Sequence, residues 1–280
     1  FYIKKDVTLP SITDNQLGDD TWRNADTAVY NVDFADTGGS LLQRAQIKIT
    51  TGAAQTGTLI TDWADHITGI NAASYTGDWG LGSGVWNLLQ SGGNYVSVRV
   101  YDNASNLQTV TDAFYVKKDT TVPVITDNQA GDDAWRNSGA AVYNVDFTDA
   151  GGSLMKQMEV KITTGAGQTG TLLLDWTPLL TGIDSASYAS DWGLGASTFS
   201  LLQSGTNYVS VRVSDYAGSQ AALTDAFYVR KDTQAPVITD GQAGENVWRN
   251  SNSGTYNVSL ADAGGSLLSK FQVRASTVPG

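Results

Sequence analysis

The chain has no cysteine, a single histidine and only two glutamates among its 280 residues. Without cysteine, disulfide bonds, thiolate catalysis and cysteine-ligated zinc are excluded. One histidine also excludes His-rich metal sites. Basic residues are few, with 17 lysines and arginines against 28 acidic residues and a formal net charge of −11. Because nucleic acids and anionic membranes bind through basic patches, we expect neither as a partner.

Long hydrophobic runs and helix-forming segments are also missing. No apolar run approaches the roughly 18 residues that a membrane helix needs, so no membrane insertion is expected. Of the 28 acidic residues 26 are aspartate, and glycine contributes 30 residues. Aspartate, asparagine and glycine favour turns, while the plentiful valine, isoleucine, threonine and tyrosine favour strands. The composition therefore predicts an all-β protein.

A repeat of 113 residues organises the chain. The segment Phe1–Asp6 returns as Phe114–Asp119 and again as Phe227–Asp232, and a Gly-Gly-Ser-Leu motif returns with the same offset. Aligned without gaps, residues 1–113 and 114–226 are identical at 71 positions. A unit of this length is domain-sized, whereas solenoid repeats of 20–50 residues must stack to bury a core. We therefore predict a row of independent domains.

Proline-containing joints set the boundaries of these domains. Proline donates no hydrogen bond to a sheet and restricts the residue before it, which suits a domain edge. The predicted boundaries are residues 1–6 for the last strand of a preceding repeat, 7–119 for repeat 1, 120–232 for repeat 2, and 233–280 for part of repeat 3. Within repeat 2, apolar and polar residues alternate over 143–147, 158–163 and 209–214. About seven short strands of this kind predict an antiparallel β-sandwich.

Two segments resemble bacterial immunoglobulin-like and fibronectin type III-like repeats. One is the joint Asp119-Thr120-Thr121-Val122-Pro123, and the other is Leu202–Tyr208 with the Val-x-Val-x-Val strand and the Asp215-x-Ala-Gly turn after it. The resemblance implies tandem sandwiches of large extracellular or cell-surface bacterial proteins, where such repeats act as stalks, extenders, coats or filament components. Tyr208 departs from the parity of the following valines, so we expect a bulge or no tyrosine corner.

Calcium at the joints is the cofactor that the aspartate excess favours, because hard cations bind carboxylate, amide and carbonyl oxygens. The predicted ligands lie around the joint between repeats 1 and 2 and are Asp119, Asp127, Asn128, Asp132, Asp133 and Asp215. The alternative is that these aspartates only form turns and keep the surface soluble. Adjacent pairs such as Asp132-Asp133 would point to opposite faces of a strand, which is poor geometry for acid–base catalysis, so no enzyme activity is expected.

Tryptophan is abundant, and whether its rings are exposed or buried distinguishes a glycan-binding role from a role in core packing. An exposed row of Trp63, Trp79 and Trp86 would suit a glycan-binding module. Burial of these rings would instead anchor the sandwich cores. Trp86 is replaced by Phe199 in repeat 2, which favours packing.

The lysines at the ends of the closing strands, Lys117 and Lys118, are expected to be solvated. The broken units at the two ends have two explanations. The chain is an excerpt of a longer array, or it assembles head to tail with strands from a neighbour. The expected partners are accordingly further repeats of the same protein or other copies of the chain.

The predicted function is structural: a repeat array that acts as a spacer, coat or fibre building block. The alternatives are an adhesin or glycan-binding module, and accessory repeats of a larger enzyme.

Overall fold

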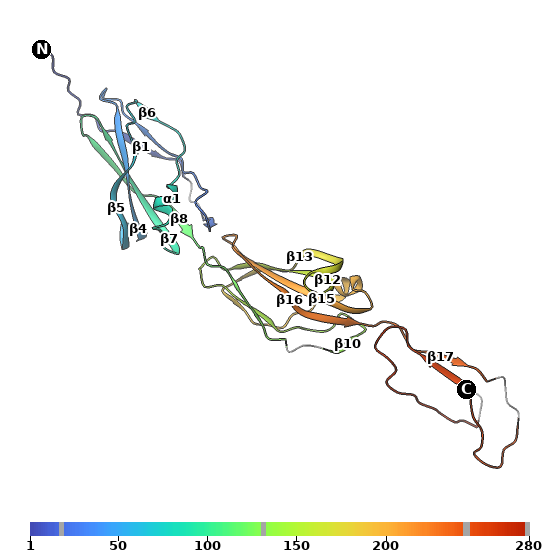
Figure 1. Ribbon diagram of the computed structural model, residues 1–280. Helices are drawn as coiled ribbons and strands as arrows, with labels where there is room; N and C mark the ends of the chain where they lie inside the picture. Colours follow the sequence, from blue (N-terminus) through green and yellow to red (C-terminus); the bar gives the residue numbers. More distant parts are fainter. Residues whose placement is uncertain (17–19, 130–132, 243–246, 278–280) are drawn as a thin grey trace.

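The computed structural model describes residues 1–16, 20–129, 133–242 and 247–277. Two β-sandwiches follow one another along an elongated molecule, and the two termini lie at opposite ends (Figure 1). This arrangement confirms the prediction of tandem antiparallel sandwiches from an all-β composition.

Repeat 1 is built from two sheets that face each other. The smaller sheet has the order β1-β3-β6 and the larger sheet the order β2-β8-β7-β4-β5. The elements are β1 (Ser11–Asp14), β2 (Trp22–Arg23), β3 (Val32–Ala35), β4 (Leu42–Gly52), β5 (Thr56–Thr68), β6 (Ser74–Tyr75), α1 (Gly82–Trp86), β7 (Gly92–Asp102) and β8 (Leu107–Lys118). All named pairings are antiparallel except that of β2 with β8, which is parallel.

Repeat 2 has the same architecture, with sheets ordered β14-β11-β9 and β10-β16-β15-β12-β13. Its elements are β9 (Val124–Asp127), β10 (Trp135–Arg136), β11 (Val145–Thr148), β12 (Met155–Gly165), β13 (Thr169–Ser185), β14 (Ser187–Tyr188), α2 (Gly195–Leu201), β15 (Gly205–Asp215) and β16 (Gln220–Lys231). Strand β13 is 17 residues long, and β-bulges let it follow β12 along its whole length.

The cores form where the apolar faces of the two sheets meet. In repeat 2, Val145 and Phe147 of β11 pack with Val160 of β12 and with Val209 and Val211 of β15. Successive side chains of a strand point to opposite faces, so the period-2 patterns in the sequence place these residues inward. Trp192 joins this core, and its indole N–H donates to the Val145 carbonyl oxygen at 3.1 Å.

An asparagine occupies the inward position where the resemblance places a corner tyrosine. Asn207 is fully buried in β15, and its amide donates to the carbonyl oxygens of Gln203, Gly205 and Val229 at 2.9–3.3 Å. Tyr208 lies half-buried beside it, and the register of β15 against β16 shifts between Val209 and Val211. A bulge therefore follows Tyr208, and Asn207 takes the buried position that a corner tyrosine would occupy.

Residues 233–242 and 247–277 hold one small sheet, in which β17 (Val237–Asp240) pairs with β18 (Val258–Ala261). This pairing repeats the register of β9 with β11. Large apolar side chains are exposed here, including Ile238, Phe271 and Val273. Across the described ranges, none of the helices is long and apolar enough to cross a membrane.

The solvated state expected for Lys118 is wrong. Its side chain is buried, and Nζ donates at 2.9 Å each to the carbonyl oxygens of Trp86, the last residue of α1, and Leu89, three residues further on. A cation here adds a charged donor at the end of a short helix, where the Trp86 carbonyl oxygen also accepts the Leu89 backbone N–H at 3.2 Å. Burial lowers the pKa of Lys118. Lys231 makes the same contacts in repeat 2, to Phe199, Ser200 and Leu202.

Replacing Lys118 with methionine should destabilise repeat 1 by about 2 kcal/mol, because two buried carbonyl oxygens lose a charged donor. Hydrogen exchange followed by mass spectrometry would report the opening free energy of β8 and α1. The matched control is Lys117→Met, which removes the exposed ion pair with Asp20 and the cation–π contacts with Trp22 and Tyr115 but no bond to a buried carbonyl oxygen. Equal effects of the two substitutions would contradict the assigned role.

Candidate metal centre at the joint between repeats

Three aspartates converge where repeat 1 meets repeat 2. Asp119 directly follows β8, Asp149 directly follows β11, and Asp215 is the last residue of β15. One carboxylate oxygen from each lies within 4.8 Å of those of the other two. All three residues are buried, with relative exposures of 0 %, 4 % and 1 %. We call these residues the joint trio.

The Gly-Gly-Ser-Leu motif is the loop that brings the joint trio together. A Cβ on Gly151 would lie 1.8 Å from Oδ1 of Asp119, so any side chain here would displace this carboxylate. Gly152 has a φ of 102°, which glycine adopts without steric cost, and Leu154 is held at a φ of 67°. The loop then directs the amide of Ser153 to Oδ2 of Asp119 at 2.9 Å.

Two carboxylate oxygens of the joint trio have no hydrogen-bond partner. They are Oδ2 of Asp149 and Oδ2 of Asp215, and both are buried. The other oxygen of each residue accepts a backbone N–H, from Gly151 at 3.2 Å and from Ser219 at 2.8 Å. Buried polar atoms are nearly always paired, so unpaired carboxylate oxygens indicate a group that completes them.

Burial raises the pKa of both carboxyls, and their charged neighbours add to the effect. Burial contributes most to the raised pKa of Asp149, and Asp119 raises it further. Burial is again the main cause for Asp215, whose pKa is also raised by Asp119 and Asp149. Like charges held together out of water favour either protonation or a bound cation.

The donor set suits calcium. Ca²⁺ binds six to eight oxygens at about 2.3–2.6 Å, so two ligand atoms on opposite sides of the ion lie up to about 5 Å apart. The separations within the joint trio fall inside this limit. Three carboxylates also supply the charge that a divalent cation needs, with water or backbone carbonyls completing the shell.

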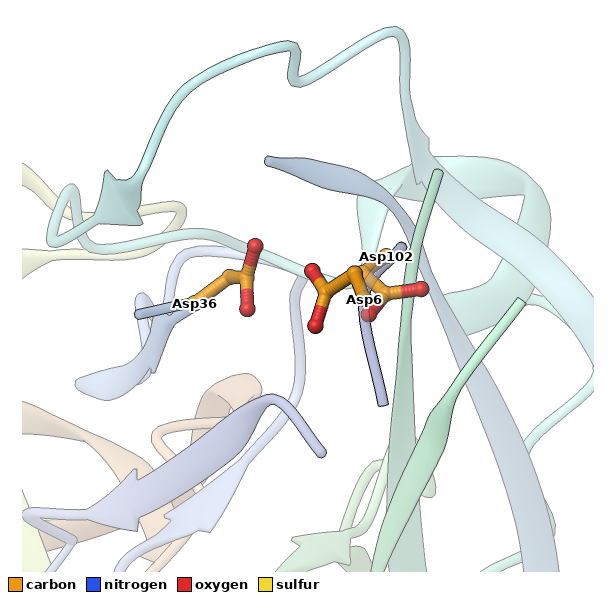
Figure 2. A group of neighbouring side chains, drawn as sticks. All are labelled: Asp6, Asp36 and Asp102. Carbon is orange, nitrogen blue, oxygen red and sulfur yellow. The ribbon is translucent and has the colours of Figure 1, made fainter. Parts of the chain in front are cut away.

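Repeat 1 has an equivalent trio, Asp6, Asp36 and Asp102, whose ligand oxygens meet the same separation limit. Figure 2 shows the carboxylates of Asp6 and Asp36 facing each other, with Asp102 beside Asp6. Asp36 and Asp102 are buried, whereas Asp6 is half-buried. Here Oδ2 of Asp102 accepts the side-chain amide of Asn106 at 2.7 Å, and Oδ2 of Asp36 accepts the amide of Leu41 at 2.8 Å.

The joint also contains a direct contact between the two repeats. The ring edge of Trp22 in β2 lies over Gly152, where an added Cβ would be 3.4 Å from Trp22. Asn24 Nδ2 donates to Oγ of Ser219 at 3.4 Å. Asp119 belongs to both sides, because its backbone N–H donates to the Arg23 carbonyl oxygen at 2.9 Å while its carboxylate lies in the joint trio.

The next joint repeats the pattern. An added Cβ on Gly265 would lie 3.0 Å from Trp135, and Asp232 donates its backbone N–H to the Arg136 carbonyl oxygen at 2.9 Å. The Ser266 amide donates to Oδ2 of Asp232 at 3.0 Å. The contact is therefore a property of the repeat.

The structure distributes the calcium ligands predicted from the sequence over two regions. Asp119 and Asp215 lie in the joint trio. Asp127 and Asn128 lie away from it, because β9 runs from Val124, paired with Thr148 next to the trio, to Asp127 at its far end. Three residues of strand separate these ends by about 10 Å.

The remaining predicted ligands have other positions. Asn128 donates to Oδ1 of Asn144 and Oδ2 of Asp146, at 3.1 Å and 2.8 Å. Asp133 accepts from the Tyr228 hydroxyl and pairs with Arg230 at 3.0 Å. Asp132 lies outside the described residues.

Asp149 was missed as a ligand, although a signal for it exists. The motif Asp-x-Gly-Gly-Ser recurs as Asp36, Asp149 and Asp262 with the 113-residue offset. Two adjacent glycines after an acidic residue indicate a loop that something approaches closely, and here that group is the carboxylate of Asp119.

The three tryptophans considered for glycan binding do not form an exposed row. Trp79 and Trp86 are buried in the core of repeat 1, and the indole N–H of Trp79 donates to the Val32 carbonyl oxygen at 3.2 Å. Trp63 is half-buried on the outer face of the larger sheet, with the Arg99 guanidinium 4.4 Å from the ring centroid. The core explains two of the three rings, and a cation–π contact with Arg99 accounts for the third.

Comparison with known proteins gives similarities of fold only. No protein-family model and no curated protein matches the chain. Among solved structures, a tetra-tandem repeat from the extending region of a large adhesion protein is 17% identical with a TM-score of 0.32. It matches 84% of this chain, which spans about half (53%) of that one.

Two further structures are similar at lower identity. The fibronectin(III)-like modules of Clostridium thermocellum CbhA are 10% identical, with a TM-score of 0.29 and coverage of 80% of this chain and 95% of theirs. A DUF3823 family protein from Parabacteroides merdae is 11% identical, with a TM-score of 0.26 and coverage of 80% and 99%.

The raised pKa values of Asp149 and Asp215 predict the pH dependence of the calcium-free protein. Because their folded-state pKa exceeds the unfolded value, the folded state binds protons more tightly, and these two carboxyls add stability as the pH falls through the folded-state pKa. The gain is complete below the unfolded pKa.

With a chelator present, repeat 2 of Asp149→Asn should therefore gain less stability between about pH 7 and pH 4 than wild type. Thermal unfolding monitored by circular dichroism measures the stability of both proteins at each pH. Aspartates elsewhere contribute equally to wild type and variant, so their effect cancels when the two stabilities are subtracted. Calcium should remove the wild-type gain, because protons then compete with the ion. Parallel curves for the two proteins would contradict the assignment.

Proposed function

We propose that this chain is a spacer segment of an extracellular bacterial surface or filament protein, in which calcium at the joints holds successive β-sandwiches in line. The observation that carries the proposal is the position of Asp119 between the two repeats. Its backbone is fixed to repeat 1 through the carbonyl oxygen of Arg23, and its buried carboxylate belongs to a trio whose other members come from repeat 2. An ion bound there would bridge the two repeats.

The direct contacts at the joint support the same function. Trp22 and Asn24 contact loops of repeat 2 on either side of the joint trio, and only Thr120–Pro123 lie between Asp119 and β9. A short joint with three points of attachment resists bending more than a flexible linker does. Repetition of this joint would give length and stiffness, which are the properties a spacer needs.

An extracellular setting suits a site of this kind. Extracellular calcium modules work with dissociation constants of about 10⁻⁴–10⁻³ M, matched to the calcium outside cells. Three carboxylates from separate loops, of which Asp119 joins the other two only when the repeats are docked, fit that moderate affinity.

Calcium titration of the full chain tests the metal site. Calorimetry should detect binding that Asp149→Asn weakens by at least about tenfold, since one charged ligand becomes neutral. Asp127→Asn is the matched control, because it removes the same charge from a residue outside the joint trio. Calcium at about 100 times its dissociation constant should stabilise repeat 2 by about 2.7 kcal/mol. Equal weakening by both substitutions, or no binding to wild type, would contradict the proposal.

Small-angle scattering tests the contact between the repeats. Gly152→Leu should push Trp22 away and reduce the maximum dimension of the chain by bending the joint. Gly39→Leu is the control: Gly39 has a similar φ of 93°, so the strain is matched, but an added Cβ there meets nothing within 4 Å. Scattering curves that change equally in both variants would show that Trp22 does not set the geometry of the joint.

A further inference from the structure

The two trios differ in one neighbouring side chain. Asn106 and Ser219 occupy equivalent positions, each four residues after the last aspartate of its trio. Both residues donate their backbone N–H to Oδ1 of that aspartate at 2.8 Å, so the turn itself is the same. Their side chains differ in whether they donate a hydrogen bond to the other carboxylate oxygen, Oδ2, of that aspartate.

In repeat 1 the side-chain amide of Asn106 is hydrogen-bonded to two residues of the trio. Its Nδ2 donates to Oδ2 of Asp102 at 2.7 Å and to the carbonyl oxygen of Asp6 at 3.3 Å. A neutral donor thus satisfies an oxygen that a cation would need, and it links two members of the trio. Binding an ion there requires that this amide be displaced.

In repeat 2 the equivalent oxygen is open. Ser219 accepts a hydrogen bond from Asn24 of repeat 1, and Oδ2 of Asp215 is buried without a partner. The shorter serine side chain therefore contacts the preceding repeat and leaves the carboxylate available. Oδ2 of Asp149 also lacks a hydrogen bond of normal geometry, although the Leu154 amide lies close enough to this carboxyl to lower its pKa, as the equivalent Leu41 amide donates to Oδ2 of Asp36 at 2.8 Å.

We propose that the residue at this position, Asn106 or Ser219, determines whether an aspartate trio binds a divalent cation. Asparagine closes the trio with its own amide, and serine leaves it open for calcium. The proposal rests on the proposed function, because it assumes that the joint trio is a calcium site. It makes the joint between repeats 1 and 2 a calcium joint and makes the trio of repeat 1 metal-independent.

Exchange of the two residues in the full chain tests this proposal, with CaCl₂ as the titrant in calorimetry at constant ionic strength. Wild type should bind one calcium ion per chain through the joint trio. Asn106→Ser should add a second ion. Ser219→Asn should weaken the existing site by about 10–100-fold, the usual effect of altering a group next to a metal ligand.

Ser219→Ala separates the two roles of the serine. It removes the contact with Asn24 but supplies no amide, so calcium binding should persist. Asp149→Asn and Asp36→Asn, combined with these variants, identify which trio holds each ion.

The outcomes distinguish this proposal from the function on which it rests. Two equivalent ions in wild type, or unchanged stoichiometry and affinity in both exchange variants, would overturn the role of Asn106 and Ser219 while leaving the calcium joint intact. The absence of calcium binding in wild type and in Asn106→Ser would overturn both.

Discussion

The burial of three like charges at one point between two domains is the constraint on which the rest of the joint depends. Asp119, Asp149 and Asp215 are removed from water, and two of their oxygens lack hydrogen-bond donors. Gly151 is needed because any side chain would displace Asp119, and Gly152 because of its positive φ. A divalent cation would convert this unfavourable arrangement into the strongest attachment between the repeats, since the ligands come from both sides.

Stability and function are separated in this chain. Each sandwich is held by its own apolar core, its buried asparagine in β7 or β15, and the lysine that binds the carbonyls after the short helix. The joint between repeats 1 and 2 contains the buried aspartates of the joint trio and Trp22, and the next joint contains Trp135. The size of each sandwich determines the distance between successive joints, and the contacts at a joint determine how one repeat is oriented relative to the next.

Local patterns predicted most of the fold. The 113-residue offset and the alternation around Val209–Val213 specify sandwiches, because period-2 patterning decides which face is buried. The parity of Tyr208 indicated a bulge or the absence of a tyrosine corner, and the register of β15 shifts just after it, but the parity could not identify Asn207 as the buried residue. Lys118 was misjudged, because its burial depends on a helix end about thirty residues away in sequence. Such long-range partners leave no signal near the lysine itself.

The joint trio was predictable only in part, for a related reason. Composition predicted calcium ligands near the joint, and two of the predicted residues, Asp119 and Asp215, lie in the joint trio. Asp127 and Asn128 are close to Asp119 in sequence, but strand β9 carries them to its far end. Asp149 is remote in sequence from both partners and reaches them only through sheet pairing. The difference between Asn106 and Ser219 acquires meaning only once both trios are seen in three dimensions.

A crystal structure grown in calcium, with anomalous scattering used to identify the ion, tests the central claim most directly. The account predicts an anomalous peak between the carboxylates of Asp119, Asp149 and Asp215, with oxygen ligands at about 2.3–2.6 Å and with Trp22 docked on Gly152. Protonated carboxyls bonded to one another or to water in the same crystals, with no ion at this position, would contradict it.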